Sequence, residues 1–408
     1  MKKLSDAAHR IEGQEMFQIL AKTKILERQG KKIFHFELGD PDFNTPPNIV
    51  EAAYKSIRSG ETHYAPSSGL LELKETAANV TARSRNFRPE INQMLVCPGA
   101  NVIIYYAAAC TVNSGEEVIV PDPGFVSYYS ILKFLGVKIV RVPLRENNKF
   151  RLDPSEVEKA VTSKTRMIIM NSPSNPTGAV MTAEEIQRVY EIAEKNDVYL
   201  LSDEIYARMV YRDEKIDHYS PSRFDHCKER TIIVNGFSKS YAMTGWRLGV
   251  ATGPAEVIEK MGLLLETTTS CVSPFIQRAG IEALKGSQKL IVEMVEEFRK
   301  RRDNIVKGLN SLPGVNCLTP QGAFYVFPNI TQTGWTSEEF ADVMLSEAGV
   351  AVVPGPVFGE YAEGYVRLCY ANSIKNTTEA VEKMQSVLKR RLPEKSKDDF
   401  TGLSTGKN

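Results

Sequence analysis

The chain has 408 residues, 42% of them hydrophobic and 25% charged, and its 51 Lys and Arg residues nearly balance 50 Asp and Glu residues. This composition is typical of a globular protein with more than one domain, and the balanced charge argues against nucleic acid or an anionic membrane as a partner. Residues 1–10 lack the apolar core of a secretory signal, and no apolar run reaches the roughly 18 residues that span a bilayer. We therefore expect a cytoplasmic protein.

The first half of the chain predicts an arm followed by a layered domain. Residues 1–45 are expected to form an N-terminal arm that joins the C-terminal small domain. This arm should contain a helix followed by a strand at residues 33–38. Over residues 46–285, apolar runs alternate with amphipathic segments such as 182–196. Runs that are apolar on both faces suit parallel strands covered by helices, so this alternation predicts a large α/β domain. The clearest runs lie at residues 117–120, 137–140, 167–170, 199–202 and 231–234.

The last third of the chain has a different pattern. Longer charged amphipathic segments alternate with isolated apolar runs, which predicts a smaller α+β domain at residues 286–392. Residues 393–408 are polar and poor in apolar residues, which favours a disordered tail. The expected helices of the small domain lie at residues 290–309, 338–348 and 377–391, and its expected strands at 322–328 and 365–370.

The cysteines and histidines show no metal-binding pattern. None of the six cysteines belongs to a C-x-x-C pair, and none of the five histidines belongs to an H-E-x-x-H motif. Scattered cysteines of this kind are typical of reduced thiols in the cytoplasm. We expect no bound metal.

The most informative segment is residues 238–249, in which Lys239 lies among small and hydroxyl residues eight positions before Arg247. A lysine in such a setting can form an imine with an aldehyde, and the arginine and hydroxyls can hold a phosphate on the same molecule. Pyridoxal 5'-phosphate requires both of these functions from its protein. The alternative is a surface lysine and arginine on an ordinary helix.

Three further segments, 175–178, 202–206 and 365–368, combine with residues 238–249 into one pattern. In order and spacing this pattern resembles the class I/II aminotransferases, which are pyridoxal-phosphate enzymes of fold type I, and in particular their bacterial aspartate aminotransferase-like branch. The resemblance extends from about Phe36 to the last helix. It implies a large domain with a mostly parallel, seven-stranded-type sheet flanked by helices, together with a smaller α+β domain and a homodimer with shared active sites.

The resemblance gives catalytic roles to three residues. Lys239 matches the Schiff-base lysine and proton shuttle, and desolvation and nearby positive charge are expected to lower its pKa. Asp203 matches the aspartate that pairs with the pyridine nitrogen, although a helix N-cap is an equally good local interpretation. Tyr206 matches the tyrosine that bonds the cofactor's O3', with a buried core tyrosine as the alternative. Asn175 matches a second O3' ligand on the substrate side, and the alternative there is a turn residue before proline.

The cofactor's phosphate is assigned to two places in the sequence. Arg247 and Ser238 match an arginine and a hydroxyl ligand of the family. Gly99, Ala100 and Asn101 open an apolar helical segment after a strand-like run, and a helix N-terminus binds phosphate through its amide groups.

Two positions near these ligands carry further implications of the resemblance. Tyr64 resembles a tyrosine that reaches the phosphate of the neighbouring subunit. Gly236 stands where some members carry a phosphate-binding serine, so the remaining ligands are expected to hold the phosphate without it.

The resemblance also implies how the ring and the substrate are held. Phe125 matches the aromatic residue that stacks on the cofactor ring, with an ordinary core phenylalanine as the alternative. Arg367 lies inside an apolar strand and matches the arginine that binds the substrate α-carboxylate through two parallel hydrogen bonds. A structural ion pair is the competing interpretation. Gly39 matches the backbone position that closes over the same carboxylate.

The expected reaction is transfer of the amino group of an L-amino acid to a 2-oxo acid in a two-stage cycle. Elimination, cyclisation or oxidation on the same cofactor is the alternative. A non-catalytic ligand-sensing domain is a second one, but the roughly forty residues before the core lack a basic helix-turn-helix pattern. The related bacterial branch can use a lysine in the glycine loop to meet a distal carboxylate. This chain has Asn101 there, so aspartate is in doubt as the best substrate.

Overall fold

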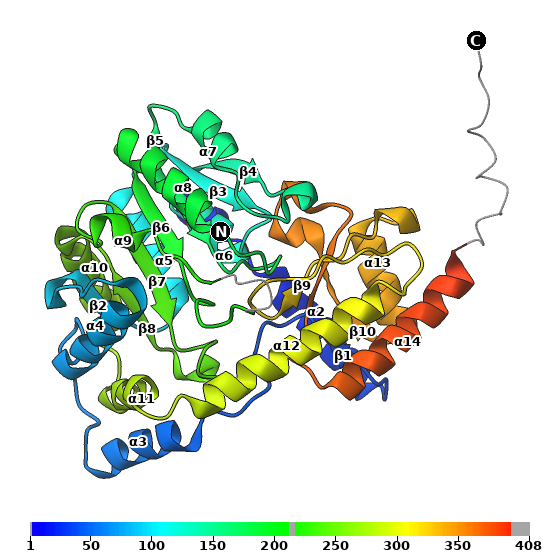
Figure 1. The fold of residues 1–408 in the computed structure, drawn as a ribbon, viewed down its shortest axis with the longest axis horizontal. Coiled ribbons are helices and arrows are strands. Elements are labelled where there is room, and N and C mark those ends of the chain that lie inside the picture. The colour runs from blue at the N-terminus through cyan, green and yellow to red at the C-terminus, as the bar shows by residue number, and fades with distance from the viewer. Residues whose placement is uncertain (1, 212–216, 393–408) are drawn as a thin grey trace.

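The computed structural model describes residues 2–211 and 217–392. Its larger part is a seven-stranded sheet in the order β2-β8-β7-β6-β5-β3-β4, in which every pairing is parallel except the two made by β8. Helices cover both faces of this sheet (Figure 1). The strands are β2 (Met94–Cys97), β3 (Glu117–Asp122), β4 (Lys138–Pro143), β5 (Thr165–Asn171), β6 (Tyr199–Asp203), β7 (Thr231–Gly236) and β8 (Gly249–Thr252).

The central strands are buried because successive side chains enter two different apolar layers. In β3, for example, Val118 and Val120 pack in the layer with α5, α6 and α10, whereas Ile119 packs in the layer with α7 and α8. At the β2 edge, Met94 and Val96 contact a third cluster formed with α3, α4 and α11. These helices are α3 (Pro47–Arg58), α4 (Leu71–Arg85), α5 (Ala100–Thr111), α6 (Val126–Phe134), α7 (Pro154–Ala160), α8 (Ala183–Lys195), α10 (Ala255–Thr269) and α11 (Pro274–Lys285). The short α9 (Ser222–Asp225) precedes β7.

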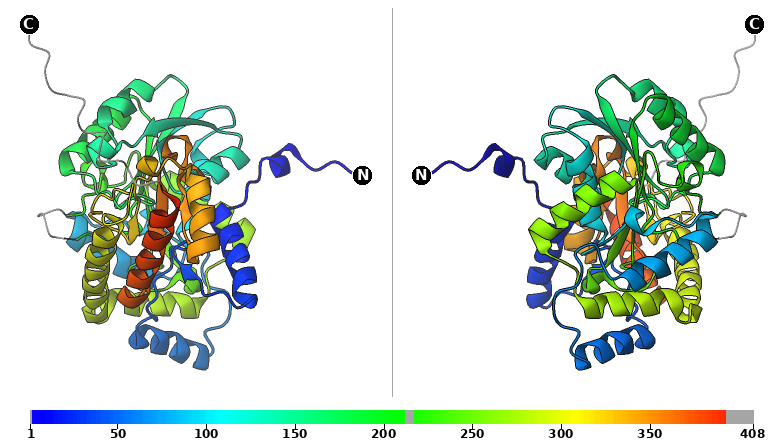
Figure 2. Two further views of the ribbon diagram at one scale, coloured as in Figure 1. Left: turned by 90° about the vertical axis from the view of Figure 1, so that its right-hand side faces the viewer. Right: turned by 90° about the vertical axis from the view of Figure 1, so that its left-hand side faces the viewer.

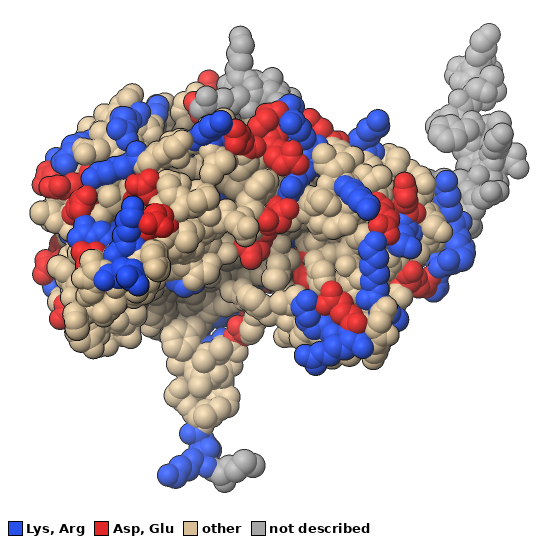
Figure 3. All heavy atoms as spheres, turned by 90° about the horizontal axis from the view of Figure 1, so that it is seen from below, with Lys and Arg blue, Asp and Glu red and all other residues tan. Residues whose placement is uncertain are grey.

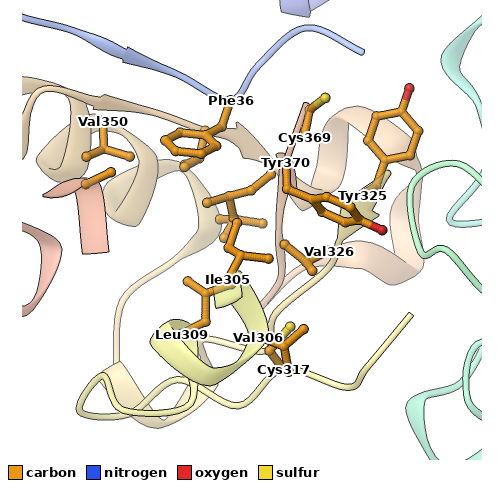
Figure 4. Close-up of a cluster of buried hydrophobic side chains, with 14 of the residues drawn as sticks. Phe36, Ile305, Val306, Leu309, Cys317, Tyr325, Val326, Val350, Cys369 and Tyr370 are labelled. Carbon is orange, nitrogen blue, oxygen red and sulfur yellow. The ribbon is translucent and has the colours of Figure 1, made fainter. Parts of the chain in front are cut away.

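The smaller part packs long helices against short strands (Figure 1). Its main core gathers Phe36, Ile305, Leu309, Val326 and Tyr370 among others, as Figure 4 shows. A three-stranded antiparallel sheet has the order β11-β12-β9, and β1 pairs in parallel with β10. The elements are β1 (Phe34–His35), β9 (Tyr325–Val326), β10 (Val350–Ala351), β11 (Val353–Pro354), β12 (Val366–Cys369), α12 (Lys289–Leu309), α13 (Ser337–Val343), a π-helical turn (Met344–Ala348) and α14 (Ile374–Arg391). Short 3-10 segments lie at Ile91–Gln93, Glu146–Asn148, Thr244–Trp246, Thr331–Thr333, Gly355–Phe358 and Glu360–Ala362.

The N-terminal arm divides between the two parts. Its α1 (Asp6–His9) projects from the body, as Figure 2 shows, and α2 (Glu15–Arg28) follows. Between these helices, the Arg10 guanidinium donates to the carbonyl of Phe134, and Gln14 donates to Ser127 Oγ at 3.0 Å. The arm therefore contacts α6 beside the large sheet before β1 joins the small part.

The molecular surface carries no one-sided charge on the face seen from below, where Lys and Arg are interspersed with Asp and Glu (Figure 3). Over residues 2–211 and 217–392, no helix combines the length and the apolar character needed to cross a bilayer.

The predicted fold class is confirmed, with two differences in detail. The predicted runs at 117–120, 167–170, 199–202 and 231–234 lie within strands, and the run at 137–140 lies within β4 except for its first residue, Val137. The strand β8 was not predicted, since its four residues include a glycine and an alanine and form no long apolar run. The predicted strand at 322–328 is ordered as β9 over two residues only. The predicted tail, 393–408, lies outside the described residues.

Candidate active site

A cavity of about 380 Å³ opens at the carboxyl ends of the parallel strands. Because β5, β6 and β7 all end at this edge, the residues that follow them converge there although they are far apart in sequence. Most of the predicted site residues line the cavity: Gly39, Ala100, Asn101, Phe125, Asn175, Asp203, Tyr206, Ser238, Lys239, Arg247 and Arg367.

Lys239 lies in the connection between β7 and β8, and not on a helix. Its ammonium group donates to the carbonyl of Gly39 at 2.5 Å. Burial lowers the pKa of Lys239 to about 8, and the positive charges of Arg247 and Arg367 act in the same direction against the carboxylate of Asp40. The lowered pKa is the property expected of a lysine that must also exist as a free amine.

Asp203 ends β6 and is buried. No α-helix begins after it, so the helix N-cap interpretation is wrong; one carboxylate oxygen instead accepts from the amide of Ile205 at 3.1 Å. The other accepts from the hydroxyl of Tyr128 at 2.6 Å. Burial raises the pKa of Asp203 to about 6, while these two hydrogen bonds oppose the rise. The carboxyl group is therefore held ready to receive a cationic partner.

Arg367 lies on β12 and only 1% of its surface is exposed. It donates to Asn175 Oδ1 at 3.2 Å and to the carbonyl of Glu37, while its Nε has no hydrogen-bond partner among the described residues. Its guanidinium lies over the rings of Tyr325 and Phe358, 4.8 Å from each centroid. Within the described part of the chain no carboxylate pairs with Arg367, so the ion-pair alternative is not supported. A buried cation without an anionic partner suits an anionic ligand.

Tyr206 lies on the turn after β6, and its hydroxyl is 2.7 Å from that of Tyr325. Tyr325 also explains the glycine at position 39, because a Cβ on Gly39 would overlap the Tyr325 hydroxyl. Asn175 is fixed in a similar way, since its backbone amide donates to Asn171 Oδ1 at 2.8 Å. Tyr325 and Asn171, which also line the cavity, and Tyr128 thus hold predicted site residues in place.

The glycine loop and Arg247 meet at the N-terminus of α5. Gly99 is the residue before this twelve-residue helix and has φ 95°, and a Cβ there would overlap the Arg247 guanidinium. Gly249 is equally constrained, since its Cβ would lie 2.9 Å from the carbonyl carbon of Gly99. Arg247 itself donates to the carbonyl of Thr244 at 2.9 Å. Free amides at a helix N-terminus beside a guanidinium form a cradle suited to phosphate.

Two predicted residues lie outside the cavity lining. Gly99 is directly beneath it, in the cradle described above. Tyr64 is 88% exposed and lies on the surface of the single chain, so the structure does not bring it to the site.

The remaining wall of the cavity was not predicted. It includes Gln14, Met16 and Phe17 of the N-terminal arm, with Leu38 and Ile104 beside them. Although Gly39, later in the arm, was predicted at the site, nothing in the sequence of residues 14–17 indicated that they reach it. Tyr128, which donates to Asp203, was also missed, but the sequence contained an indication of it. It follows the predicted Phe125 by about one helical turn on α6, and the two rings pack edge to face with centroids 5.6 Å apart.

The cavity fits pyridoxal phosphate on chemical grounds. Its residues provide an amine at Lys239, a buried carboxyl group at Asp203, and a phosphate cradle between Gly99 and Arg247. The aromatic ring of Phe125 lies on the same wall.

Comparison with known proteins agrees with this arrangement. Residues 31–384 match the family model described as aminotransferase class I and II. An aspartate aminotransferase of Pyrococcus horikoshii is 42% identical over 369 residues, covering 90% of this chain and 93% of the relative. The aromatic-amino-acid aminotransferase 2 of Thermococcus litoralis is 41% identical over 362 residues, covering 88% and 92%. The solved aspartate aminotransferase of Thermus thermophilus with maleate superposes with a TM-score of 0.90 at 36% identity, covering 95% of this chain and all of that one.

The expected family, fold type, cofactor and amino-group transfer are confirmed by these matches. The chain belongs to the class I and II aminotransferases, pyridoxal-phosphate enzymes that move an amino group from an amino acid to a 2-oxo acid.

Proposed function

We propose that this transaminase anchors the α-carboxylate of its substrate on Arg367, works through Lys239, and prefers amino acids with uncharged side chains. The observation that carries the proposal is the burial of Arg367 without a carboxylate partner among the described residues. A planar guanidinium that already lies over two aromatic rings can present parallel N–H groups to a carboxylate.

Lys239 is the residue that would hold the cofactor and move the substrate's α-proton. When bound, pyridoxal phosphate supplies the aldehyde and an electron sink for the carbanion. With a pKa of about 8, roughly a tenth of the free Lys239 amine is neutral at pH 7, against about one in a few thousand for an ordinary lysine. A neutral amine in this position can accept a proton and then return it, as a general base and acid.

The other residues would hold the cofactor in place. Asp203 would keep a positive charge on the ring nitrogen, with Tyr128 maintaining the carboxylate in its charged form. Arg247, Ser238 and the amides of Ala100 and Asn101 would hold the phosphate. Phe125 would cover the ring, while Tyr206 and Asn175 would bond O3'.

The preference for uncharged side chains follows from those residues of the cavity wall that hold neither the cofactor nor the substrate α-carboxylate. Among the described residues, the cations that line the cavity are Lys239, Arg247 and Arg367, and each already has a role. The rest of the wall is apolar at Met16 and Phe17 and carries neutral amides at Gln14 and Asn101, and the further acidic side chain that lines it, Asp40, is a carboxylate. A second substrate carboxylate would therefore lose water here without gaining a counter-charge.

We also propose a homodimer in the cytoplasm. Support for the dimer comes from exposed apolar residues at helical spacing on α3, namely Val50, Tyr54 and Ile57, and from the exposed Tyr64. Tyr64 would reach the phosphate in the partner's site. The six free cysteines fit a reducing compartment. Residues 46–285 would form the cofactor domain, and residues 286–392 the small one.

Single-turnover measurements test the proposed function. The holoenzyme is mixed with a panel of L-amino acids without acceptor, and conversion of the cofactor to pyridoxamine phosphate is followed by absorbance. We expect conversion to be faster with phenylalanine, methionine or glutamine than with aspartate. Ammonia release or oxygen uptake without conversion would instead indicate elimination or oxidation.

The anchor is tested with Arg367→Met and, for comparison, Arg247→Met. Two charge-assisted hydrogen bonds are together worth about 3 kcal/mol or more, so Arg367→Met should raise KM by about 100-fold or more while the cofactor stays bound. Arg247→Met should instead weaken cofactor retention. Unchanged kinetics in Arg367→Met would show that the arginine is structural.

A further inference from the structure

His35 of β1 lies between two glutamate side chains and is not part of the active-site cavity lining. Its Nδ1 is 2.8 Å from Oε1 of Glu37, and its Nε2 is 2.9 Å from Oε1 of Glu27 on α2. A neutral imidazole has one N–H and can donate from only one of its two nitrogens, whereas an imidazolium donates from both. Two nitrogens that each face a carboxylate therefore fit a histidine that carries a positive charge.

The charged groups that face His35 are these two glutamates. Lys24 lies one step further away and donates to the other carboxylate oxygen of Glu27 at 2.8 Å. The strand β10 and the helix α14 also pack against β1, but within residues 2–211 and 217–392 neither forms an ion pair with His35. The pKa of His35 is raised chiefly by the hydrogen bond to Glu37, while burial opposes the rise and the bond to Glu27 adds to it.

Glu37 depends on His35 for its counter-charge. The Glu37 side chain has no exposed surface, and its Oε2 has no hydrogen-bond partner among the described residues. In the same part of the chain, no lysine or arginine pairs with this carboxylate. A buried charge without a partner is strongly unfavourable, so a side chain that loses its counter-charge favours conformers that reach water. The position of Glu37 should therefore depend on the charge of His35.

The main chain of Glu37 also holds Arg367. Among the described residues, the guanidinium of Arg367 has two hydrogen-bond acceptors, the carbonyl of Glu37 and Oδ1 of Asn175 at 3.2 Å. Phe36, the residue before Glu37, is fixed by main-chain hydrogen bonds of 3.0 Å to β10 and 2.8 Å to β12. Movement of the Glu37 side chain toward water would shift the main chain directly after this fixed point. Such a shift would loosen the hydrogen bond to Arg367.

We propose that His35 and Glu37 are positioning residues for substrate binding: charged His35 fixes Glu37, and the Glu37 carbonyl orients Arg367 toward the substrate α-carboxylate. The inference rests on the proposed role of Arg367 as the carboxylate anchor. It adds that the carboxylate is bound tightly while His35 is protonated and more weakly once His35 is neutral.

The test measures binding of 3-phenylpropanoate to the holoenzyme by isothermal titration calorimetry at about pH 6 and about pH 9, on either side of the ordinary range of histidine titration. This probe has a carboxylate but no amino group, so it binds without reacting. Each variant is compared with the wild type at the same pH, so that titrations common to both proteins cancel. Loss of one charge-assisted hydrogen bond corresponds to about tenfold in affinity.

Two variants should depart from the wild type at opposite ends of this pH range. His35→Gln removes the counter-charge, so it should bind the probe about tenfold more weakly than the wild type at the lower pH. At the higher pH the two should bind equally, because the wild-type histidine is then neutral as well. Glu37→Gln removes the buried charge but keeps the carbonyl. It should bind like the wild type at the lower pH and about tenfold more tightly at the higher pH.

The matched control is His218→Gln. His218 also faces a buried glutamate, since its Nε2 is 3.2 Å from Oε2 of Glu204. Within the described ranges, neither of these residues is a hydrogen-bond partner of Arg367. The control should therefore bind the probe like the wild type at both pH values.

Arg367→Met separates this inference from the proposed function. If this variant binds the probe as well as the wild type, then Arg367 is not the carboxylate anchor and the inference falls with it. If Arg367→Met binds weakly while His35→Gln and Glu37→Gln match the wild type at both pH values, then the inference alone is wrong. A loss of affinity in His35→Gln that is equal at the two pH values would also overturn it, because the effect would not come from the charge of the histidine.

Discussion

Removal of the Tyr128 hydroxyl should destabilise the protein in a pH-dependent way, because its partner Asp203 is a buried carboxyl group. The pKa of Asp203 is about 6 in the folded protein, above the ordinary value of an aspartate. The folded state therefore binds more protons than the unfolded state between about pH 4 and pH 6, and stability falls as pH rises through this window. Above about pH 6, Asp203 is charged in the folded protein, and burial of this charge lowers the free energy of unfolding. The hydrogen bond from Tyr128 makes that loss smaller.

The magnitude follows from the charge on the acceptor. A hydrogen bond to a charged group contributes about 1.5–3 kcal/mol, and one between neutral groups about 1 kcal/mol. Tyr128→Phe of the cofactor-free protein should thus lower the free energy of unfolding by about 1.5–3 kcal/mol at pH 8, but by only about 1 kcal/mol at pH 5. The folded pKa of Asp203 should rise by about half a unit to one and a half units in the variant, because the charged form loses about 0.5–2 kcal/mol more than the neutral form.

Urea denaturation at both pH values and a fixed protein concentration measures this difference. The control is Tyr129→Phe, because Tyr129 is also buried on the same helix but donates to the neutral carbonyl of Pro121 at 2.8 Å. Its effect should be similar at the two pH values. Equal losses of stability in Tyr128→Phe at pH 5 and pH 8 would refute the reasoning.

Three further changes have expected outcomes. Gly39→Ala should lower kcat/KM at least tenfold, because the new methyl group overlaps the Tyr325 hydroxyl and must displace it. The pKa of His35 is raised, chiefly by its hydrogen bond to Glu37, so its stabilising contribution is present below about pH 6.5 and is lost as pH rises through the raised value; His35→Gln should remove this part of the pH dependence of Tm. Asn101→Lys should raise the kcat/KM for aspartate relative to methionine by about tenfold, since it adds a cation to the part of the cavity wall that would face the substrate side chain.

Each of these changes has a control or a contrary result. Gly262 lies on α10, and the methyl group of Gly262→Ala would be 3.7 Å from Leu95, an ordinary contact distance. This variant should therefore keep full activity. If Gly39→Ala is equally active, then the close approach of Tyr325 has no catalytic importance. An unaltered Tm profile in His35→Gln would show that the histidine does not hold α2 and β1 together through its charge. If Asn101→Lys leaves the preference between aspartate and methionine unchanged, then the lack of a free cation in the cavity does not explain the preference for uncharged side chains.

The success of sequence-based prediction varied with how locally each role is encoded. Lys239 and Arg247 were placed correctly in the cavity because one short segment carries both, and Asp203 because it follows a recognisable buried strand, while the chemical roles of all three stay predictions. Tyr325 was missed because its contact with Gly39 joins positions far apart in the chain. Phe17 was missed for a similar reason, since its place in the cavity depends on where the arm crosses α6.

The reversed direction of β8 has a consequence for how the enzyme tolerates changes in length. Because β8 runs antiparallel beside β7, the intervening residues 237–248 return to the sheet at the edge they left, with Gly236 opposite Gly249. Lys239 and Arg247 are therefore spaced by one closed loop. A residue inserted between Lys239 and Arg247 would change the distance between these two side chains in the cavity. Natural length variation should accordingly avoid this loop and accumulate in the connections around it.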